Sequence, residues 1–351
     1  MLAPVHHILP LTTVRRERAL PVPGRITARL DQKVTALDIV AEASLGSQHK
    51  LIDVALLLGV RAEKAQELMQ VKAGDVVTAN QTLAAKSGLS PQIVRAPRDG
   101  RVLLVSSGQI LMEVGEGTFE LKARLPGTVS RHIPERGVEI TFSGTLVQGV
   151  WGNGRVDVGI LLPLLQSPAD AFTASMLDVS MRGAVLLAGH CSEAAALKTA
   201  AELPARGLIL GSMSALLIPQ AQQLQIPILL TDGFGDRPMN AAAYKLLSTN
   251  EKRETTVNAD TLDRQTGTHP EVYIPLPVTQ EPPLPRAVET FAPNQPVRIT
   301  RAPYAGQTGS LSKLLPGLTA FPSGLHLPAA EVRLESGEKA VVPTANLEVL
   351  G

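Results

Sequence analysis

The sequence predicts a multidomain α+β protein with a β-rich N-terminal half, a small α/β domain and a short β-rich C-terminal domain. Its 351 residues exceed one ordinary hydrophobic core and suit two or three domains. Hydrophobic residues make up 44% but aromatic residues only 3%, and 29 Gly and 27 Pro indicate many short strands and turns. Between residues 179 and 260 the pattern changes to short apolar runs that alternate with helical segments.

Residues 1–20 are predicted to form an N-terminal arm. The run Arg15, Arg16, Glu17, Arg18 is polar and shows no periodicity. This composition favours a solvated tail or edge, and contact with an anionic partner is the alternative.

Residues 21–165 are predicted to form a β-rich domain. A turn pair precedes a segment of alternating character at three places, and Gly supplies the positive φ that such turns require. These pairs are Pro23-Gly24, Asp99-Gly100 and Pro126-Gly127.

A helical hairpin is predicted to interrupt this domain over residues 49–70. Leu51, Val54, Ala55 and Leu58 recur at the spacing of one helical face, and Gly59 ends the first helix. We expect this face to pack on the core, with a partner groove as the alternative.

Two stretches in the same domain, 71–85 and 93–105, carry a recognisable pattern. It reads Gly-Asp-x-Val, then Leu-Ala, then Ala-Pro-x-Asp-Gly-x-Val. The pattern resembles the barrel-sandwich hybrid fold of biotinyl and lipoyl carrier domains, which other proteins use without a cofactor. The resemblance implies a modifiable lysine at a hairpin tip, but Lys86 lies within Ala-Ala-Lys-Ser-Gly and far from Ala96-Pro97. We therefore expect no cofactor, and a solvated loop for Lys86.

Trp151, the single tryptophan, lies among Gly149, Gly152 and Gly154. An indole in this setting suits a core anchor at a domain junction, with an exposed partner-binding residue as the alternative.

The segment 179–260 is predicted to be a Rossmann-like α/β domain with a parallel sheet of about four strands. Alternation of strands and helices with short links requires parallel pairing and right-handed connections. The expected strands are Gly183–Ala188, Gly207–Leu210, Ile226–Leu230 and Glu254–Val257, and the expected helices are Ser192–Leu203, Met213–Leu224 and Met239–Leu247.

The carboxyl ends of these strands are the place where open parallel sheets bind ligands. Small, polar and glycine residues follow three strands, and two of these ends open helices, where free N–H groups favour an anion. The candidate ligand-binding residues are His190, Cys191, Ser212, Ser214, Asp232, Gly233 and Gly235. A Cys-His-Asp catalytic group is the sharper alternative, whereas helix capping by Ser192 and burial of Cys191 are the plainer ones.

Residues 261–292 hold six prolines and are predicted to be an extended linker or strap. The segment that follows, 293–351, begins with Pro-Val-Arg-Ile-Thr-Arg-Ala-Pro-Tyr-Ala-Gly-Gln-Thr-Gly from Pro296 to Gly309. It resembles the KOW motif of NusG-type transcription factors and several ribosomal proteins. The resemblance implies an SH3-like barrel that contacts RNA or protein, or that only packs internally.

The resemblance also implies which residues contact a partner. They are Arg298, Arg301, Tyr304, Gly306, Gly309 and Lys313, to which the exposed alternative for Trp151 is added. In that family the glycines bend the first hairpin, and the cations give the domain a local positive bias.

Bulk properties exclude several classes of protein. A net charge of +1 gives no general attraction to nucleic acid, so such binding requires a local patch. One cysteine excludes an intrachain disulfide framework, and we find no phosphate-loop, dinucleotide or zinc-protease motif. The sequence shows no signal peptide or membrane span, so we expect a cytoplasmic protein without a metal or cofactor.

The sequence therefore predicts a non-catalytic adaptor or scaffold that binds a protein or ribonucleoprotein through the KOW-like barrel. Two alternatives remain open. One is a small-molecule or anion-binding module at the strand ends of the α/β domain, and the other is an enzyme that uses the same site.

Overall fold

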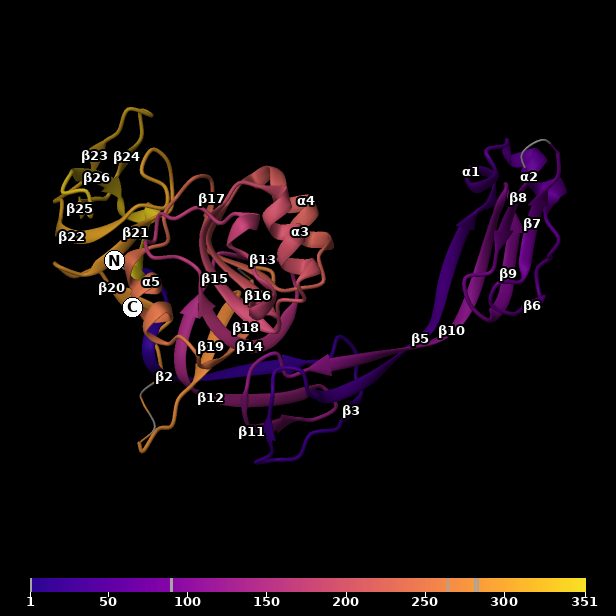
Figure 1. Ribbon diagram of the computed structural model, residues 1–351, viewed down its shortest axis with the longest axis horizontal. Coiled ribbons are helices and arrows are strands. Elements are labelled where there is room, and N and C mark those ends of the chain that lie inside the picture. The colour runs from indigo at the N-terminus through magenta and orange to yellow at the C-terminus, as the bar shows by residue number, and fades with distance from the viewer. Residues whose placement is uncertain (1, 89–90, 264, 281, 283) are drawn as a thin grey trace.

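The protein is an elongated, β-rich, multidomain α+β molecule with a large body and a distal domain at the end of a long arm (Figure 1). The computed structural model describes residues 2–88, 91–263, 265–280, 282 and 284–351. Both termini lie in the body, close together (Figure 1).

The arm consists of two antiparallel strands, β5 (Ile39–Asp53) and β10 (Gln109–Lys122). Pairing runs from Leu121 opposite Ala41 at the base to Ile110 opposite Ile52 at the tip. A strand of 15 residues extends roughly 50 Å at about 3.3 Å per residue. Residues 44–51 of β5 are exposed, so the arm crosses solvent between two separate cores.

The distal domain surrounds the tips of these two strands and has a core of its own. That core includes Val54, Leu58, Leu83 and Met112. Its remaining elements are α1 (Val54–Leu58), α2 (Ala62–Leu68), β6 (Val76–Val77), β7 (Thr82–Lys86), β8 (Gln92–Arg95) and β9 (Gly100–Ser106).

The helical insert predicted over 49–70 is shorter than expected at its start. Residues 49–53 continue β5, and α1 begins only after Asp53, whose carboxylate accepts a hydrogen bond from Leu56 N at 2.9 Å. Gly59 ends α1 in the left-handed conformation, with φ 59°.

The N-terminal segment is not a free arm, although its polar run lies on an edge strand, one of the two forms that its composition favoured. It forms β1 (Leu2–His6) and β2 (Ile8–Ala19), and β2 pairs with β12 (Gly137–Gln148). The charged residues are tolerated because β2 alternates between its faces: Val14 is buried, whereas Arg15 is exposed. This region packs a second core with β3 (Arg25–Ile26), β4 (Lys33–Val34) and β11 (Gly127–Ile133).

The largest sheet has 11 strands and passes through the body. Its four parallel strands are β14 (Val156–Pro163), β15 (Ala184–Cys191), β16 (Gly207–Met213) and β17 (Ile228–Phe234), with β13 (Trp151–Gly152) antiparallel at the edge. Helices α3 (Ala194–Glu202), α4 (Ile218–Gln223) and α5 (Ala241–Thr249) connect or follow them. Short 3-10 turns lie at Ala174–Met176, Val179–Met181 and Ala215–Leu217.

Two expectations for this sheet are corrected. The predicted fourth parallel strand is β18 (Glu254–Asn258), which runs antiparallel to β14. The proline-rich segment is not only a linker, because it contains β19 (Glu271–Pro275) between β18 and β12. Residues 271–274 are all buried. The prolines on either side favoured an extended linker in the sequence and gave no sign of this strand.

The C-terminal domain contains a seven-stranded sheet with its own core. Its strands are β20 (Val288–Thr290), β21 (Pro296–Ile299), β22 (Thr308–Leu314), β25 (Ala329–Leu334), β26 (Lys339–Pro343), β27 (Leu347–Leu350) and β1. A small hairpin of β23 (Thr319–Ala320) and β24 (His326–Leu327) and a 3-10 turn at Thr344–Asn346 complete it. The N-terminal strand thus belongs to this sheet, with Val5 beside Val349.

Among the helices that the structure describes, none has the length and apolar character needed to cross a membrane.

Candidate functional site

The structure brings three of the predicted ligand-binding residues to the carboxyl ends of neighbouring strands. His190 is the next-to-last residue of β15 and lies opposite Ser212 of β16, and Asp232 lies near the end of β17. All three are buried. His190 Nδ1 lies 2.9 Å from Ser212 Oγ.

The hydrogen bonds of Ser212 decide what this pair can do. Ser212 Oγ lies 2.6 Å from the Arg237 carbonyl oxygen and 3.2 Å from the Arg237 main-chain nitrogen. The single hydroxyl proton must go to the carbonyl, so the His190 Nδ1–H donates to Ser212 Oγ. In this arrangement His190 does not accept the serine proton, and the pair serves to hold the chain at Arg237.

Asp232 joins the sheet to the start of α5. Its carboxylate accepts hydrogen bonds from Thr231 Oγ1 at 2.7 Å and from Asn240 N and Nδ2, both at 2.9 Å. Burial raises the pKa of Asp232, and the nearby Arg298 guanidinium opposes this rise. Asn240 also caps α5, since its Oδ1 accepts from Ala243 N at 2.9 Å.

Arg298, predicted to face a partner, lies inside the molecule. Only 4% of its side chain is exposed. Its Nη1 donates to the Thr231 carbonyl at 2.9 Å and lies 3.7 Å from Asp232 Oδ1, and its Nε donates to Glu348. The expectation of an exposed contact is therefore wrong for Arg298, because this guanidinium fastens the C-terminal domain to the ends of the parallel strands.

Two glycines of the KOW-like segment also serve packing. A Cβ at Gly306, whose φ is 82°, would lie 2.2 Å from Arg237 Nη1. A Cβ at Gly309 would lie 2.3 Å from the Arg333 carbonyl oxygen. Tyr304 packs on the domain core, and its hydroxyl donates to Glu338 Oε1 at 3.2 Å.

The remaining cations of this segment reach solvent. Arg301 is exposed. Lys313 lies 3.6 Å from Glu331, which also pairs with Lys339 at 3.2 Å. One carboxylate thus offsets two of the cations that gave the domain its positive bias.

Cys191 is fully buried, and its Sγ lies 3.6 Å from the Glu193 carbonyl oxygen. Burial raises the pKa of this thiol to about 11, so the thiol is protonated near neutral pH. This favours the plain interpretation, a small buried apolar residue.

The other strand-end residues shape turns. Ser214 is half-buried, and its main-chain nitrogen donates to the Cys191 carbonyl at 2.9 Å. Gly233 and Gly235 have φ of 96° and 102°, which only glycine adopts without strain.

Trp151 and Lys86 make internal contacts. Trp151 is half-buried at the edge of the sheet and meets Phe234 edge to face, with 5.7 Å between ring centroids. Lys86 is not in a solvated loop, because it belongs to β7 and its Nζ donates to the Leu58 carbonyl at 3.3 Å. The stretch 89–90 that follows it lies outside the described residues.

A buried polar cluster that no sequence pattern predicted lies where β2, β12 and β19 meet. Glu271 accepts hydrogen bonds from Arg16 Nε at 3.1 Å and from Gln148 Nε2 at 3.0 Å. Burial opposes ionisation of Glu271, but the charge of Arg16 and the hydrogen bonds from Arg16, Tyr273 and Gln148 together outweigh it and lower the pKa. Glu271 belongs to β19, and because the proline-rich segment was predicted to be a linker or strap, no buried partner for Arg16 was expected there.

Three imidazoles form the histidine cluster beside Glu271: those of His6 and His7, which are buried, and that of His269, which is half-buried. Each has one buried ring nitrogen without a hydrogen-bond partner among the described residues. Burial lowers the pKa of all three, and the positive charge of Arg298 lowers that of His6 further. The adjacent pair His6-His7 was the only signal in the sequence.

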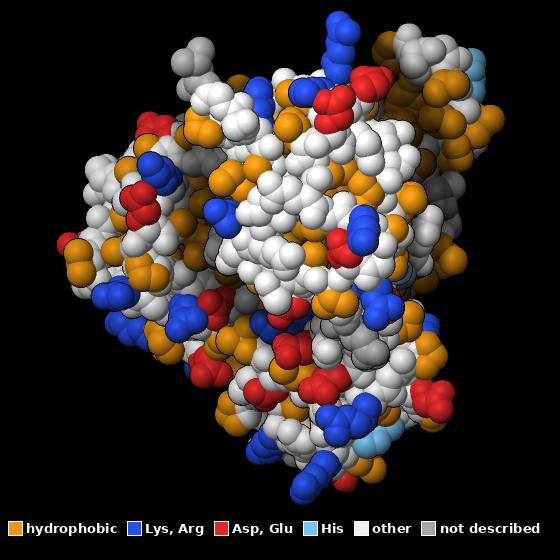
Figure 2. All heavy atoms as spheres, turned by 90° about the vertical axis from the view of Figure 1, so that its right-hand side faces the viewer, with side chains coloured by type: hydrophobic (Ala, Val, Ile, Leu, Met, Phe, Trp, Pro, Cys, Tyr) orange, Lys and Arg blue, Asp and Glu red, His pale blue; other side chains and the backbone are white. Residues whose placement is uncertain are grey.

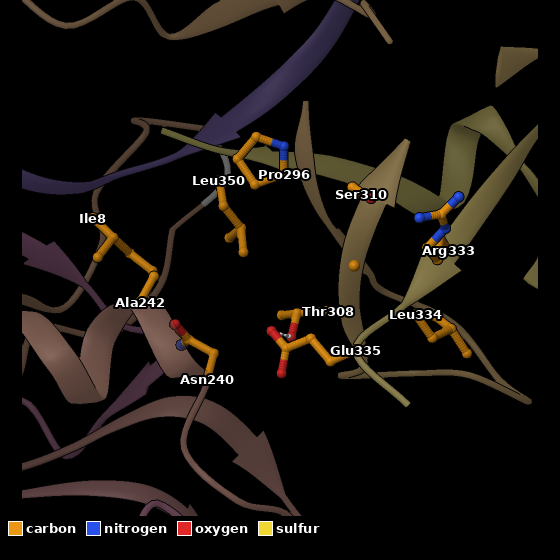
Figure 3. A pocket seen from close by; sticks show the side chains of 11 residues that line it. Ile8, Asn240, Ala242, Pro296, Thr308, Ser310, Arg333, Leu334, Glu335 and Leu350 are labelled. Atoms are coloured by element: carbon orange, nitrogen blue, oxygen red, sulfur yellow. Dashed lines mark hydrogen bonds between the residues drawn. The ribbon is translucent and has the colours of Figure 1, made fainter. Parts of the chain in front are cut away.

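A groove that no sequence pattern predicted lies between the α/β sheet and the C-terminal domain. It consists of two adjoining cavities of about 480 and 320 Å³ that share Asn240, Thr308 and Glu335. Figure 3 shows the larger cavity, with Asn240 on one side and Thr308 and Glu335 on the other.

Within the described part of the chain, no three His, Cys, Asp or Glu side chains are placed to hold a metal ion. No protein-family model matches the chain, and no curated protein matches it.

Proposed function

We propose that this protein is a non-catalytic adaptor whose arm presents the distal domain to a protein partner. The observation that carries the proposal is the two-stranded arm of β5 and β10, which separates the distal core from the body. An exposed arm buries little apolar surface of its own, so its clearest physical effect is reach.

The distal domain carries an apolar surface suited to a protein partner. Leu111 of β10 lies opposite Leu51 of β5 and Leu104 of β9, so these three side chains share one face of the sheet. We call them the distal leucine stripe. Leu51 is 61% exposed and Leu104 is 54% exposed. Neighbouring apolar residues that remain exposed mark interaction sites more often than isolated ones do.

Surface charge favours a protein partner over RNA. Viewed from the distal end, Lys and Arg side chains are interspersed with Asp and Glu (Figure 2). RNA binding draws on cationic grooves and aromatic platforms, and only 3% of the residues are aromatic. In the C-terminal domain, Arg298 is buried against the body, which favours an anchoring role for that domain.

Three fold assignments accompany this proposal. We propose a barrel-sandwich hybrid without cofactor for the distal domain, a Rossmann-like unit for the four parallel strands, and an SH3-like barrel for the C-terminal domain. The short paired strands at the arm tip support the first assignment. The parallel strands with their connecting helices support the second, and the KOW-like hairpin of β21 and β22 supports the third.

The test compares two matched double variants of the full chain in nuclease-treated pull-downs. L51K/L104K places charge on the distal leucine stripe, and L318K/L325K does so at leucines of the C-terminal domain that are 65% and 56% exposed. The affinity for a partner recovered by the unmodified chain is then measured with purified components. We expect L51K/L104K to weaken it about 100-fold or more, because two buried apolar contacts are replaced by desolvated charge.

The control variant L318K/L325K should bind like the unmodified chain. Equal binding by both variants would refute the proposed surface. Partners that are lost with nuclease, or with Arg301→Ala, would instead favour the ribonucleoprotein interpretation of the KOW-like segment.

A further inference from the structure

The larger cavity between the α/β sheet and the C-terminal domain has an apolar wall drawn from distant parts of the chain. Ile8 comes from β2, Ala242 from α5, Pro296 from β21, Leu334 from β25 and Leu350 from β27. Its volume of about 480 Å³ lies within the range of roughly 300–1,000 Å³ that small-molecule sites occupy.

One carboxylate, that of Glu335, reaches into this cavity beside Thr308 (Figure 3). The Thr308 hydroxyl donates to Glu335 Oε1 at 2.6 Å, and Glu335 N donates to the Thr308 carbonyl at 3.1 Å. These two bonds hold the turn and orient the carboxylate. A carboxylate accepts about four hydrogen bonds, so one from Thr308 leaves capacity for a ligand.

The polar group that faces Glu335 across the cavity is the side-chain amide of Asn240, which is hydrogen-bonded on its own side of the cavity. Its Nδ2 donates to Asp232 Oδ1 at 2.9 Å, and its Oδ1 accepts from Ala243 N at 2.9 Å. These bonds hold Asn240 toward Asp232 and α5, and within the described part of the chain no hydrogen bond joins it to Glu335. Arg333 also lines the cavity, but Figure 3 shows its guanidinium turned away from Glu335.

We propose that this cavity binds a small organic cation, a primary or secondary ammonium on an aliphatic body. The ammonium donates to Glu335, and the aliphatic part lies against Ile8, Pro296 and Leu350. Such a ligand touches both domains at once, so its binding stabilises their junction through mass action. This function is separate from the partner surface on the distal domain.

The test uses hexylamine as the probe and the full chain as the target. Thermal unfolding and calorimetry near neutral pH compare hexylamine with hexanol and hexanoate, which share its carbon chain but are neutral and anionic. We expect hexylamine to raise the melting temperature in a saturable way, and the other two to have little effect. E335Q should weaken hexylamine binding roughly two- to fivefold, because an ion pair at an exposed carboxylate is lost while the Thr308 contact is kept.

Glu338→Gln is the matched control, since Glu338 lies in the same β25–β26 turn, accepts a hydroxyl bond from Tyr304 and does not line the cavity. It should bind hexylamine like the unmodified chain. An equal response to hexanol, an unchanged affinity in E335Q, or no binding at millimolar hexylamine would each overturn the proposal.

Discussion

Replacing Arg298 with methionine should uncouple the C-terminal domain from the α/β sheet. Methionine keeps an apolar stem of similar reach but removes the donors to the Thr231 carbonyl and to Glu348, and the charge near Asp232. Asp232 has only 5% of its surface exposed, so its carboxylate would stay buried without a cation. Removal of one partner from a buried ion pair costs about 3–5 kcal/mol, and we expect R298M to lower the free energy of unfolding by that amount.

Denaturant unfolding measures this loss with two probes. Fluorescence of Trp151 reports on the α/β core, and circular dichroism reports on all strands. Addition of Asp232→Asn should recover part of the loss, because it removes the stranded charge. Burial already raises the pKa of Asp232 in the unmodified chain, and loss of the opposing Arg298 charge raises it further, so the ionised form is destabilised more in R298M. The deficit of R298M relative to the unmodified chain should therefore shrink as pH falls from neutral toward the raised pKa of Asp232.

Arg301→Met is the control, because Arg301 is an exposed arginine of the same domain. It should change the free energy of unfolding by less than about 0.5 kcal/mol. If R298M cost no more than this control, the anchoring role of Arg298 would be refuted. The same result would restore Arg298 as a candidate for external contacts.

Two further predictions concern buried groups. Burial lowers the pKa values of the histidine cluster, so its members stay neutral when folded, and stability should be lost as pH falls below about 6.5. The slope has an upper limit of about 1.4 kcal/mol per pH unit for each histidine, and His6→Gln or His269→Gln should reduce it in acid unfolding, unlike His326→Gln at an exposed site. Cys191 should react with iodoacetamide only after unfolding, because its thiol is buried with a pKa of about 11. Fast labelling of the native protein in mass spectrometry would contradict that prediction.

Local periodicity explains which elements the sequence predicted well. Strands β15, β16 and β17 begin within two residues of the predicted starts, because each is a short apolar run bounded by turn residues. Parallel strands place their carboxyl ends together, so His190, Ser212 and Asp232 converge as expected. Their chemistry was not readable, because it depends on Arg237 and Arg298, which come from a turn and from another domain.

Pairing over long distances explains the misses. The segment Glu271–Pro275 is short and bounded by prolines, and only its place between β12 and β18 makes it a central strand. The polar run of β2 is a strand because it pairs with β12, and its Arg16 is neutralised by Glu271, which is 255 residues away in the chain.

The sequence by itself determined the β-rich, multidomain character, the alternation of strands and helices between 179 and 260, and the left-handed turns at glycines, because these depend on neighbours within a few residues. Tertiary structure decided the rest. It made Arg298 an internal anchor, joined β1 to the C-terminal sheet, and formed the cavity around Glu335 from five strands and one helix. Burial and charge neutralisation depend on which distant segments meet, and no local pattern contains that information.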